Sequence, residues 1–184
     1  PRLIHPVVGR AAAGFLDRLL PALRPRAIGV GWGATLRETV QRMTRVSLGD
    51  DRPVICSMMG GLTRGAEVNT FEIVRSFART LDAYCHYFAA PIYADSEASR
   101  DLIAAQPIFR DLLDEAADVD VSFLSVGDVT GESLQVRYGL PPGTDISGIV
   151  AAGGVGDLLG RYLDREGRQV DHPLNRQVIS PELE

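Results

Sequence analysis

Four short apolar segments constrain most strongly what this chain can fold into. Each has the length and composition of a buried strand, and together they are 27–31, 53–59, 83–88 and 119–126. Segments with apolar residues at helical spacing alternate with them, at 6–20, 35–43, 71–78, 96–104 and 107–116. This alternation predicts an α/β fold with a doubly wound, mostly parallel sheet. The charged residues of the last helix, including Glu115, are expected to face water.

The last third of the chain predicts different structure. The segment 131–148 contains Pro141, Pro142 and Gly143 and is expected to be rich in loops. After it, the runs 157–163 and 168–170 flank a turn at 164–167, which predicts a hairpin.

Composition limits the classes of function. The length fits one domain, 1–184, and no apolar run approaches the roughly 18 residues that a membrane span needs. A net charge of −5 disfavours nucleic-acid binding by this chain alone. The sequence contains no lysine, so a Schiff-base mechanism has no amine side chain to use.

The cysteines and histidines indicate neither disulfides nor metal. Cys56 and Cys85 lie in apolar, strand-like stretches, which is typical of buried thiols in a cytoplasmic protein. His5, His86 and His172 form no spaced cluster with cysteines or carboxylates. No metal site and no cofactor are therefore expected.

The loop after the first predicted strand is the first candidate site. It contains Gly31, Trp32, Gly33, Ala34 and Thr35. Glycines let a backbone approach a ligand closely, the following helix offers free N–H groups to an anion, and a threonine adds a hydroxyl. A tight strand-to-helix turn without a ligand is the alternative.

The same loop formally matches a dinucleotide fingerprint, from Gly29 through Gly31 to Ala34. A dinucleotide site also needs an acidic residue closing the second strand, and that strand closes with Met58 and Met59. A small phosphate or sugar site is therefore favoured over a nicotinamide site.

The second candidate loop contains Gly60, Gly61, Arg64, Glu67 and Asn69. Glu67 and Asn69 suit sugar hydroxyls, and Arg64 suits a phosphate. Asn69 has an equally plain alternative role as a helix cap.

Asp157 follows a glycine-rich approach at 153–156 and is the third candidate. The alternative is an ordinary carboxylate at a strand start, facing water.

Four stretches, taken in order, resemble the sugar-binding domain of SorC-type transcription regulators. They are 29–36, 60–61 with 67–69, 90–96, and 154–164 with Gly167. The resemblance implies a phosphosugar isomerase-like fold, shared with glucosamine-phosphate deaminase and ribose-phosphate isomerase. It implies a sugar or sugar-phosphate effector and no catalytic residue. In the family the loop at Ala34 and Thr35 cradles a phosphate, while the second loop and the acid at Asp157 contact the sugar.

The resemblance also implies DNA binding through a separate helix-turn-helix domain, and a homo-oligomer. The apolar helix around Phe15, Leu16 and Leu19 suits subunit contacts. The family's helix-turn-helix segment is absent from these residues, and so are its later strand, Gly-Gly loop and lysine, so we expect a domain truncated at both ends. Ala34 replaces one of two family threonines, which predicts weaker phosphate binding.

Three alternatives stay open at this point. A phosphosugar isomerase or deaminase on the same fold would need a poised base and often a lysine, and no histidine pairs obviously with a carboxylate here. A nicotinamide-dependent oxidoreductase and a ligand-free oligomerisation module are the other two.

Overall fold

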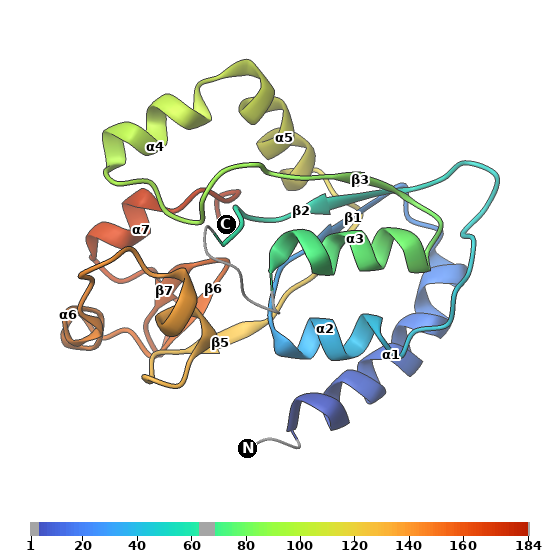
Figure 1. Cartoon of the computed structure of the whole chain (residues 1–184), viewed down its shortest axis with the longest axis horizontal. Helices are drawn as coiled ribbons and strands as arrows, with labels where there is room; N and C mark the ends of the chain where they lie inside the picture. The colour runs from blue at the N-terminus through green and yellow to red at the C-terminus, as the bar shows by residue number, and fades with distance from the viewer. Residues whose placement is uncertain (1–3, 63–68, 184) are drawn as a thin grey trace.

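Four parallel strands form the central sheet of the computed structural model, which describes residues 4–62 and 69–183 (Figure 1). They are β1 (Ala27–Val30), β2 (Val54–Ser57), β3 (Tyr84–His86) and β4 (Val121–Phe123). Their order is β3-β2-β1-β4, and each neighbouring pair is parallel. The predicted α/β fold with a mostly parallel sheet is confirmed. The order of the strands reverses between β1 and β4, where open α/β sheets bind ligands.

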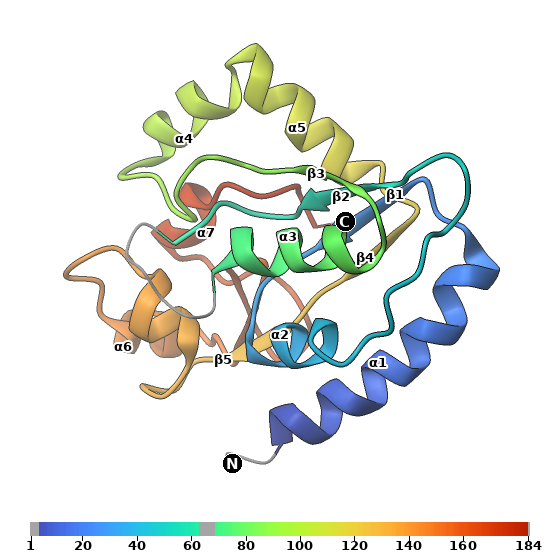
Figure 2. The same ribbon diagram turned by 45° about the vertical axis from the view of Figure 1, so that its right-hand side comes forward.

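Helices cover both faces of this sheet, as Figures 1 and 2 show. On one face lie α2 (Ala34–Val40) and α3 (Thr70–Thr80), with α1 (Ile4–Leu23) packed against α2. On the other lies α5 (Pro107–Ala117), with α4 (Glu97–Ala104) packed against α5. A Cβ added to Gly9 would lie 2.6 Å from Glu38 Cβ, so glycine permits the close crossing of α1 and α2.

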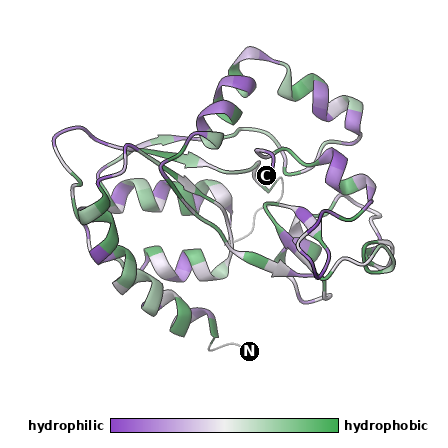
Figure 3. Cartoon of the chain, turned by 180° about the vertical axis from the view of Figure 1, so that it is seen from behind, coloured by the Kyte–Doolittle hydropathy of each residue, from purple (hydrophilic) through white to green (hydrophobic). Residues whose placement is uncertain are grey.

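The prediction that the first helix ends at residue 20 was wrong by about one turn. Pro21 lies inside α1, which continues to Leu23. A proline in the last turn removes a single backbone hydrogen bond, and the packing of Leu16 and Leu20 in the core holds the helix through it. Apolar side chains also remain exposed along α1, including Val7 and Phe15, and Figure 3 shows this helix with apolar segments.

A second, antiparallel sheet lies beside the first. It contains β5 (Val126–Asp128), β6 (Gly156–Leu158) and β7 (Arg161–Leu163) in the order β5-β6-β7. The run expected as one strand at 119–126 therefore divides into β4 and β5, because the chain leaves the parallel sheet after Phe123. The loop-rich segment carries a π-helix, η1 (Gln135–Gly139), and α6 (Ile146–Ala151).

The predicted hairpin is partly correct. The turn at 164–167 forms, with Asp164 N donating to Arg168 O at 2.8 Å, but its second arm pairs only through a bridge between Leu163 and Gln169. The run 157–163 folds back on itself instead. Leu159 and Gly160 both have positive φ, 52° and 80°, and this turn separates β6 from β7.

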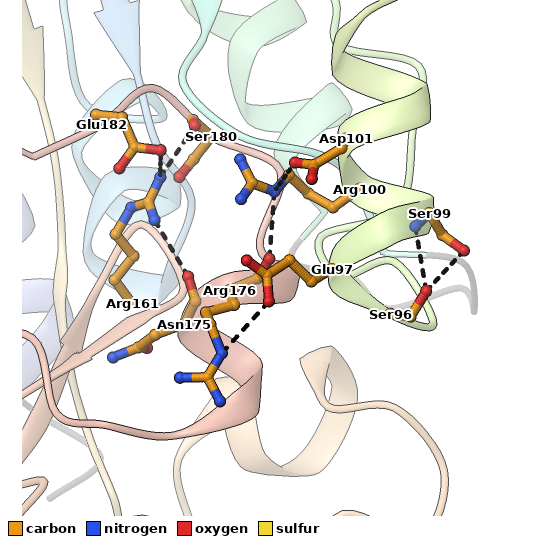
Figure 4. A network of polar contacts seen from close by, with 10 residues as sticks. All are labelled: Ser96, Glu97, Ser99, Arg100, Asp101, Arg161, Asn175, Arg176, Ser180 and Glu182. Atoms are coloured by element: carbon orange, nitrogen blue, oxygen red, sulfur yellow. Dashed lines mark hydrogen bonds and ion pairs between the residues drawn. The ribbon is translucent and has the colours of Figure 1, made fainter.

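A buried arginine ties the second sheet to the end of the chain, which carries α7 (Pro173–Gln177). Arg161 donates hydrogen bonds to the backbone oxygens of Asn175, Ser180 and Pro181, and it pairs with Glu182 at 3.2 Å (Figure 4). Its side chain is only 4% exposed. Guanidinium donors therefore supply hydrogen bonds to three buried backbone carbonyls.

Candidate functional site

A cavity of about 150 Å³ opens at the carboxyl ends of β1 and β4. We call it the acidic cavity, because three carboxylates lie among its lining residues. The lining residues are His5, Trp32, Gly33, Ala34, Thr35, Ser125, Val126, Gly127, Asp128, Glu132, Ser133, Leu134, Gln135 and Asp157. The site is thus formed by helix α1, the loops after β1 and β4, the segment that leads into η1, and strand β6.

The first loop reaches this cavity through a constrained backbone. Gly33 has a φ of 135°, and a Cβ there would lie 2.9 Å from Ser125 Oγ, so the position requires glycine. Gly33 is also the N-cap of α2, and no side chain caps this helix end. The first N–H groups of a helix have no partner within the helix, so they are available beside the cavity.

Thr35 has a partner that the sequence did not indicate. Its Oγ1 lies 2.9 Å from the His5 ring nitrogen Nδ1, across the crossing of α1 and α2. A hydroxyl and an imidazole therefore stand together at one side of the acidic cavity, where both can exchange hydrogen bonds with a bound ligand.

Asp157 is the most strongly perturbed group in the cavity. It is 4% exposed, and burial raises its pKa from 3.8 to about 6, although a hydrogen bond from Gly160 N lowers it and the nearby Asp128 raises it further. A carboxyl group that is costly to ionise here gains from any ligand hydroxyl that donates to it.

Gly127 makes room for that carboxyl. It pairs with Asp157 across β5 and β6, and a Cβ at position 127 would lie 2.0 Å from Asp157 Oδ1. No side chain larger than hydrogen fits without displacing the acid, so the glycine after β4 serves to place a carboxylate that lies thirty residues further along the chain.

A buried polar network lies between Asp157 and η1. Gln135 Nε2 donates to Tyr93 Oη at 2.8 Å, and Tyr93 Oη donates to Gly160 O at 2.5 Å. Burial raises the pKa of Tyr93 well above its usual value, so the phenol keeps its proton. Gln135 is 2% exposed and its Oε1 has no hydrogen-bond partner within the described part of the chain. Buried unpaired atoms are uncommon, and here the residue lines a cavity.

The predicted site residues divide into groups. Trp32, Gly33, Ala34, Thr35 and Asp157 all line the acidic cavity. Gly61 instead lines a second cavity of about 450 Å³, together with Pro91, Pro141 and Pro142; we call it the proline-lined cavity.

The remaining predicted residues line neither cavity or lie outside the described residues. Gly31 extends the pairing of β1 and β4 by donating to Phe123 O. Gly60 packs backbone to backbone, since a Cβ there would lie 2.2 Å from Pro91 O. Asn69 caps α3 by accepting from Phe71 N. Arg64 and Glu67 lie outside the described residues.

Sequence reasoning missed several lining residues. Ser133 and Gln135 are buried polar residues in the segment expected to be loop, and His5 lies in the first turn of α1, just before the start that the sequence predicted for this helix. Their polarity was visible in the sequence, but no spacing linked them to the glycine loops.

The expectation that no histidine pairs with a carboxylate was wrong. His86 Nδ1 lies 2.7 Å from Glu115 Oε2, and Cys56 completes a group of three whose ligand atoms lie within 4.8 Å of one another. Glu115 was expected on a solvated helix face, yet α5 turns it toward the sheet. Burial, followed by the Glu115 carboxylate, raises the pKa of the Cys56 thiol to about 12.

Comparisons with known proteins agree with this architecture. A family model described as "Putative sugar-binding domain" matches residues 2–184. The erythritol catabolism regulatory protein EryD from Brucella abortus is 27% identical over 177 residues, which are 96% of this chain and 55% of that protein. The chain therefore spans about half the length of this relative.

Solved structures share the fold. The full-length sorbitol operon regulator SorC from Klebsiella pneumoniae matches with a TM-score of 0.83 at 22% identity, over 97% of this chain and 57% of that one. A transcriptional regulator from Streptococcus pneumoniae matches with a TM-score of 0.86 at 20% identity, over 99% and 68%. The fold is thus one that bacterial transcription regulators use. This chain belongs to the "Putative sugar-binding domain" family, and the resemblance to such a domain seen in the sequence is confirmed.

Proposed function

We propose that this chain is the effector-binding domain of a bacterial transcription regulator and that a sugar or sugar phosphate binds in the acidic cavity. The buried Asp157 carboxyl group, which lines the same cavity as the uncapped N-terminus of α2, carries this proposal. Buried polar groups without full hydrogen bonding favour a ligand that supplies the missing donors, and a sugar offers many hydroxyls.

The proposed pose follows from the two sides of the cavity. A phosphate meets the backbone N–H groups at 33–35, where the partial positive charge of the helix end lies. Sugar hydroxyls meet Asp157, and Glu67 is proposed to contribute from the second loop, whereas Asn69 caps α3. Gln135 also lines this cavity, with its Nε2 donating to Tyr93 Oη.

One observation favours an unphosphorylated ligand as the second candidate. Asp128, Glu132 and Asp157 line the cavity, and no arginine is among the described residues that line it. Three carboxylates disfavour an anion and suit a polyhydroxy compound. The two candidates differ only in whether phosphate contributes to affinity.

A thermal stability panel tests the proposal. A ligand at one hundred times its Kd stabilises a fold by roughly 2.7 kcal/mol, which for a domain of this size corresponds to a rise in Tm of about 5–10 °C. Each sugar phosphate is compared with its unphosphorylated sugar at the same concentration. A larger shift with the phosphate supports the phosphate pose, and equal shifts support the second candidate.

Two variants locate the site, and one controls for charge. Thr35→Glu places a like charge beside the phosphate and should abolish the preference for the phosphorylated ligand. Asp157→Ala should weaken both ligands. Gln41→Glu adds the same charge at the exposed opposite end of α2 and should change neither. A full panel that moves the Tm nowhere would count against the assignment.

We further propose binding without turnover. The relatives are regulators, but the pKa of about 6 at Asp157 lies in the range that suits a general base, so isomerisation of ribose 5-phosphate and deamination of glucosamine 6-phosphate are the assays to run. We expect neither product above the rate without protein. Sustained turnover that Asp157→Asn abolishes would establish an enzyme.

DNA recognition is proposed to belong to a separate helix-turn-helix domain of the full-length regulator. This chain is acidic, and we expect no sequence-specific mobility shift with operator DNA, even at low salt. A specific shift would contradict this assignment. A cytoplasmic location is also proposed, where a regulator that acts on DNA would work. No helix of the described residues is long and apolar enough to span a membrane.

A homo-oligomer is proposed through α1. Leu16 packs in the core, so the interface must use the exposed side chains, among them Val7 at 66% and Phe15 at 54% exposure. Sedimentation at tens of micromolar is expected to show a species larger than 19.9 kDa. Phe15→Glu should dissociate it, and a wild-type chain that sediments only as a monomer would contradict the proposal.

A further inference from the structure

Three potential metal ligands that are far apart in the sequence lie close together in the fold, outside the acidic cavity. Cys56 lies on β2, His86 on β3 and Glu115 on α5. One ligand atom of each lies within 4.8 Å of the other two. Among the described residues this is the one group of three or more such side chains.

The fold fixes the positions of two of these ligands. Cys56 and His86 are partners in the parallel register of β2 and β3. Partners on neighbouring strands point to the same face of a sheet, with backbones about 4.8 Å apart. Their side chains therefore reach the same space, which α5 covers.

The third ligand, Glu115, reaches the other two from α5, which covers this face of the sheet. Glu115 approaches the His86 Nδ1 atom with both carboxylate oxygens, at 2.9 and 2.7 Å. The carboxylate also interacts with the Cys56 thiol. One carboxylate thus links the nitrogen and the sulfur that a cation would bind.

The exposed fraction differs among the three side chains, and the more exposed ones leave a path from solvent for a cation. Cys56 is 2% exposed, whereas the side chains of His86 and Glu115 are 43% and 31% exposed. The sulfur lies at the base, and the imidazole and carboxylate lie at the solvent side. A cation can enter from water and reach the sulfur by displacing one thiol proton.

We propose that Cys56, His86 and Glu115 bind a divalent cation of the zinc class. Thiolate, imidazole and carboxylate are the ligands that Zn²⁺ uses in proteins, and thiolate disfavours Mg²⁺ and Ca²⁺. Three protein ligands leave a fourth position for water or for another small donor. The bound cation ties α5 to the strands β2 and β3 and so stabilises this edge of the sheet.

Cobalt substitution tests the site directly, with tag-free protein so that no affinity tag supplies histidines. Co²⁺ bound to a thiolate gives a charge-transfer band in the near ultraviolet, and we expect this band at one equivalent of Co²⁺. Zn²⁺ should remove the band by displacement. At about one hundred times its Kd, Zn²⁺ should raise the Tm by about 5–10 °C.

Variants assign the ligands. Cys56→Ser should abolish the band, and His86→Gln or Glu115→Gln should weaken Zn²⁺ binding at least about tenfold, because even the loss of an outer-shell partner costs that much. The last two side chains are partly exposed, so both variants should fold. Cys85→Ser and His172→Gln are the matched controls, and both should behave as the wild type.

Two results would overturn the proposal. One is the absence of a thiolate band in the wild-type protein with excess Co²⁺. The other is a Zn²⁺-induced rise in Tm that is the same in the wild type, Cys56→Ser and His86→Gln, because the cation would then bind elsewhere.

Discussion

Replacing Asp157 by asparagine should stabilise the protein at neutral pH while weakening effector binding. The carboxyl group is 4% exposed, and burial raises its pKa from 3.8 to about 6. At about 1.4 kcal/mol for each tenfold change in proton affinity, this rise corresponds to about 3 kcal/mol of cost for ionising the group inside the fold. Asparagine has nearly the same shape, can still accept from Gly160 N, and carries no charge.

The pH dependence has a definite sign. Below about pH 4 the carboxyl group is protonated in both the folded and the unfolded chain, so it adds no pH dependence to the free energy of unfolding. Between about pH 4 and 6 the folded chain holds a proton that the unfolded chain has lost, so stability falls as pH rises. Above about pH 6 the full cost of about 3 kcal/mol applies.

Urea unfolding of the wild type and Asp157→Asn from pH 4 to 8 measures this effect. The two proteins should agree near pH 4 and separate by up to about 3 kcal/mol above pH 6, with the variant more stable. Asp164→Asn is the matched control of opposite sign, because backbone hydrogen bonds from Arg168 and Glu166 help to lower the pKa of Asp164, with Arg168 the larger contributor. If the free energy of unfolding changes with pH in the same way for the wild type and Asp157→Asn, the reasoning is refuted.

Two further substitutions test how the site and its support are built. Gly127→Ala should destabilise by about 1–3 kcal/mol and weaken effector binding, because the new Cβ displaces Asp157; Gly131→Ala meets nothing within 4 Å and should have little effect on either measurement. Arg161→Met should cost about 2–4 kcal/mol in urea unfolding, since three buried carbonyl oxygens lose a charged donor, whereas the exposed Arg176→Met should cost less than about 1 kcal/mol. Equal losses within either pair would contradict the account.

The sequence predicted the central sheet because its signal is local. A buried parallel strand is apolar along its whole length, and 27–31 and 53–59 show this without any knowledge of neighbours. The loop after β1 was also predictable, because Gly33 needs a backbone conformation that only glycine adopts easily.

The rest of the site depends on contacts between distant residues. Gly127 is needed because Asp157 lies against it, and His5 reaches Thr35 only because α1 crosses α2. No short-range pattern encodes either pair. The burial of Asp157 was likewise open, since a carboxylate after glycines reads equally well as a solvated strand start.

Glu115 shows the same limit on a helix. Asp111 and Asp114 lie near it on α5, and this pattern alone favours a solvated face. The orientation of α5 over the sheet decides that Glu115 meets His86 and Cys56 instead. That orientation is a property of packing between elements, which spacing along one helix does not encode.

Amide hydrogen exchange with and without a saturating ligand from the stability panel tests the central claim most directly. We expect protection to rise at residues 33–36 and 125–128 and around Asp157, which surround the acidic cavity, with little change at 40–45, at the far end of α2. Protection confined to residues 91–95 and 137–142, around the proline-lined cavity, would contradict the account.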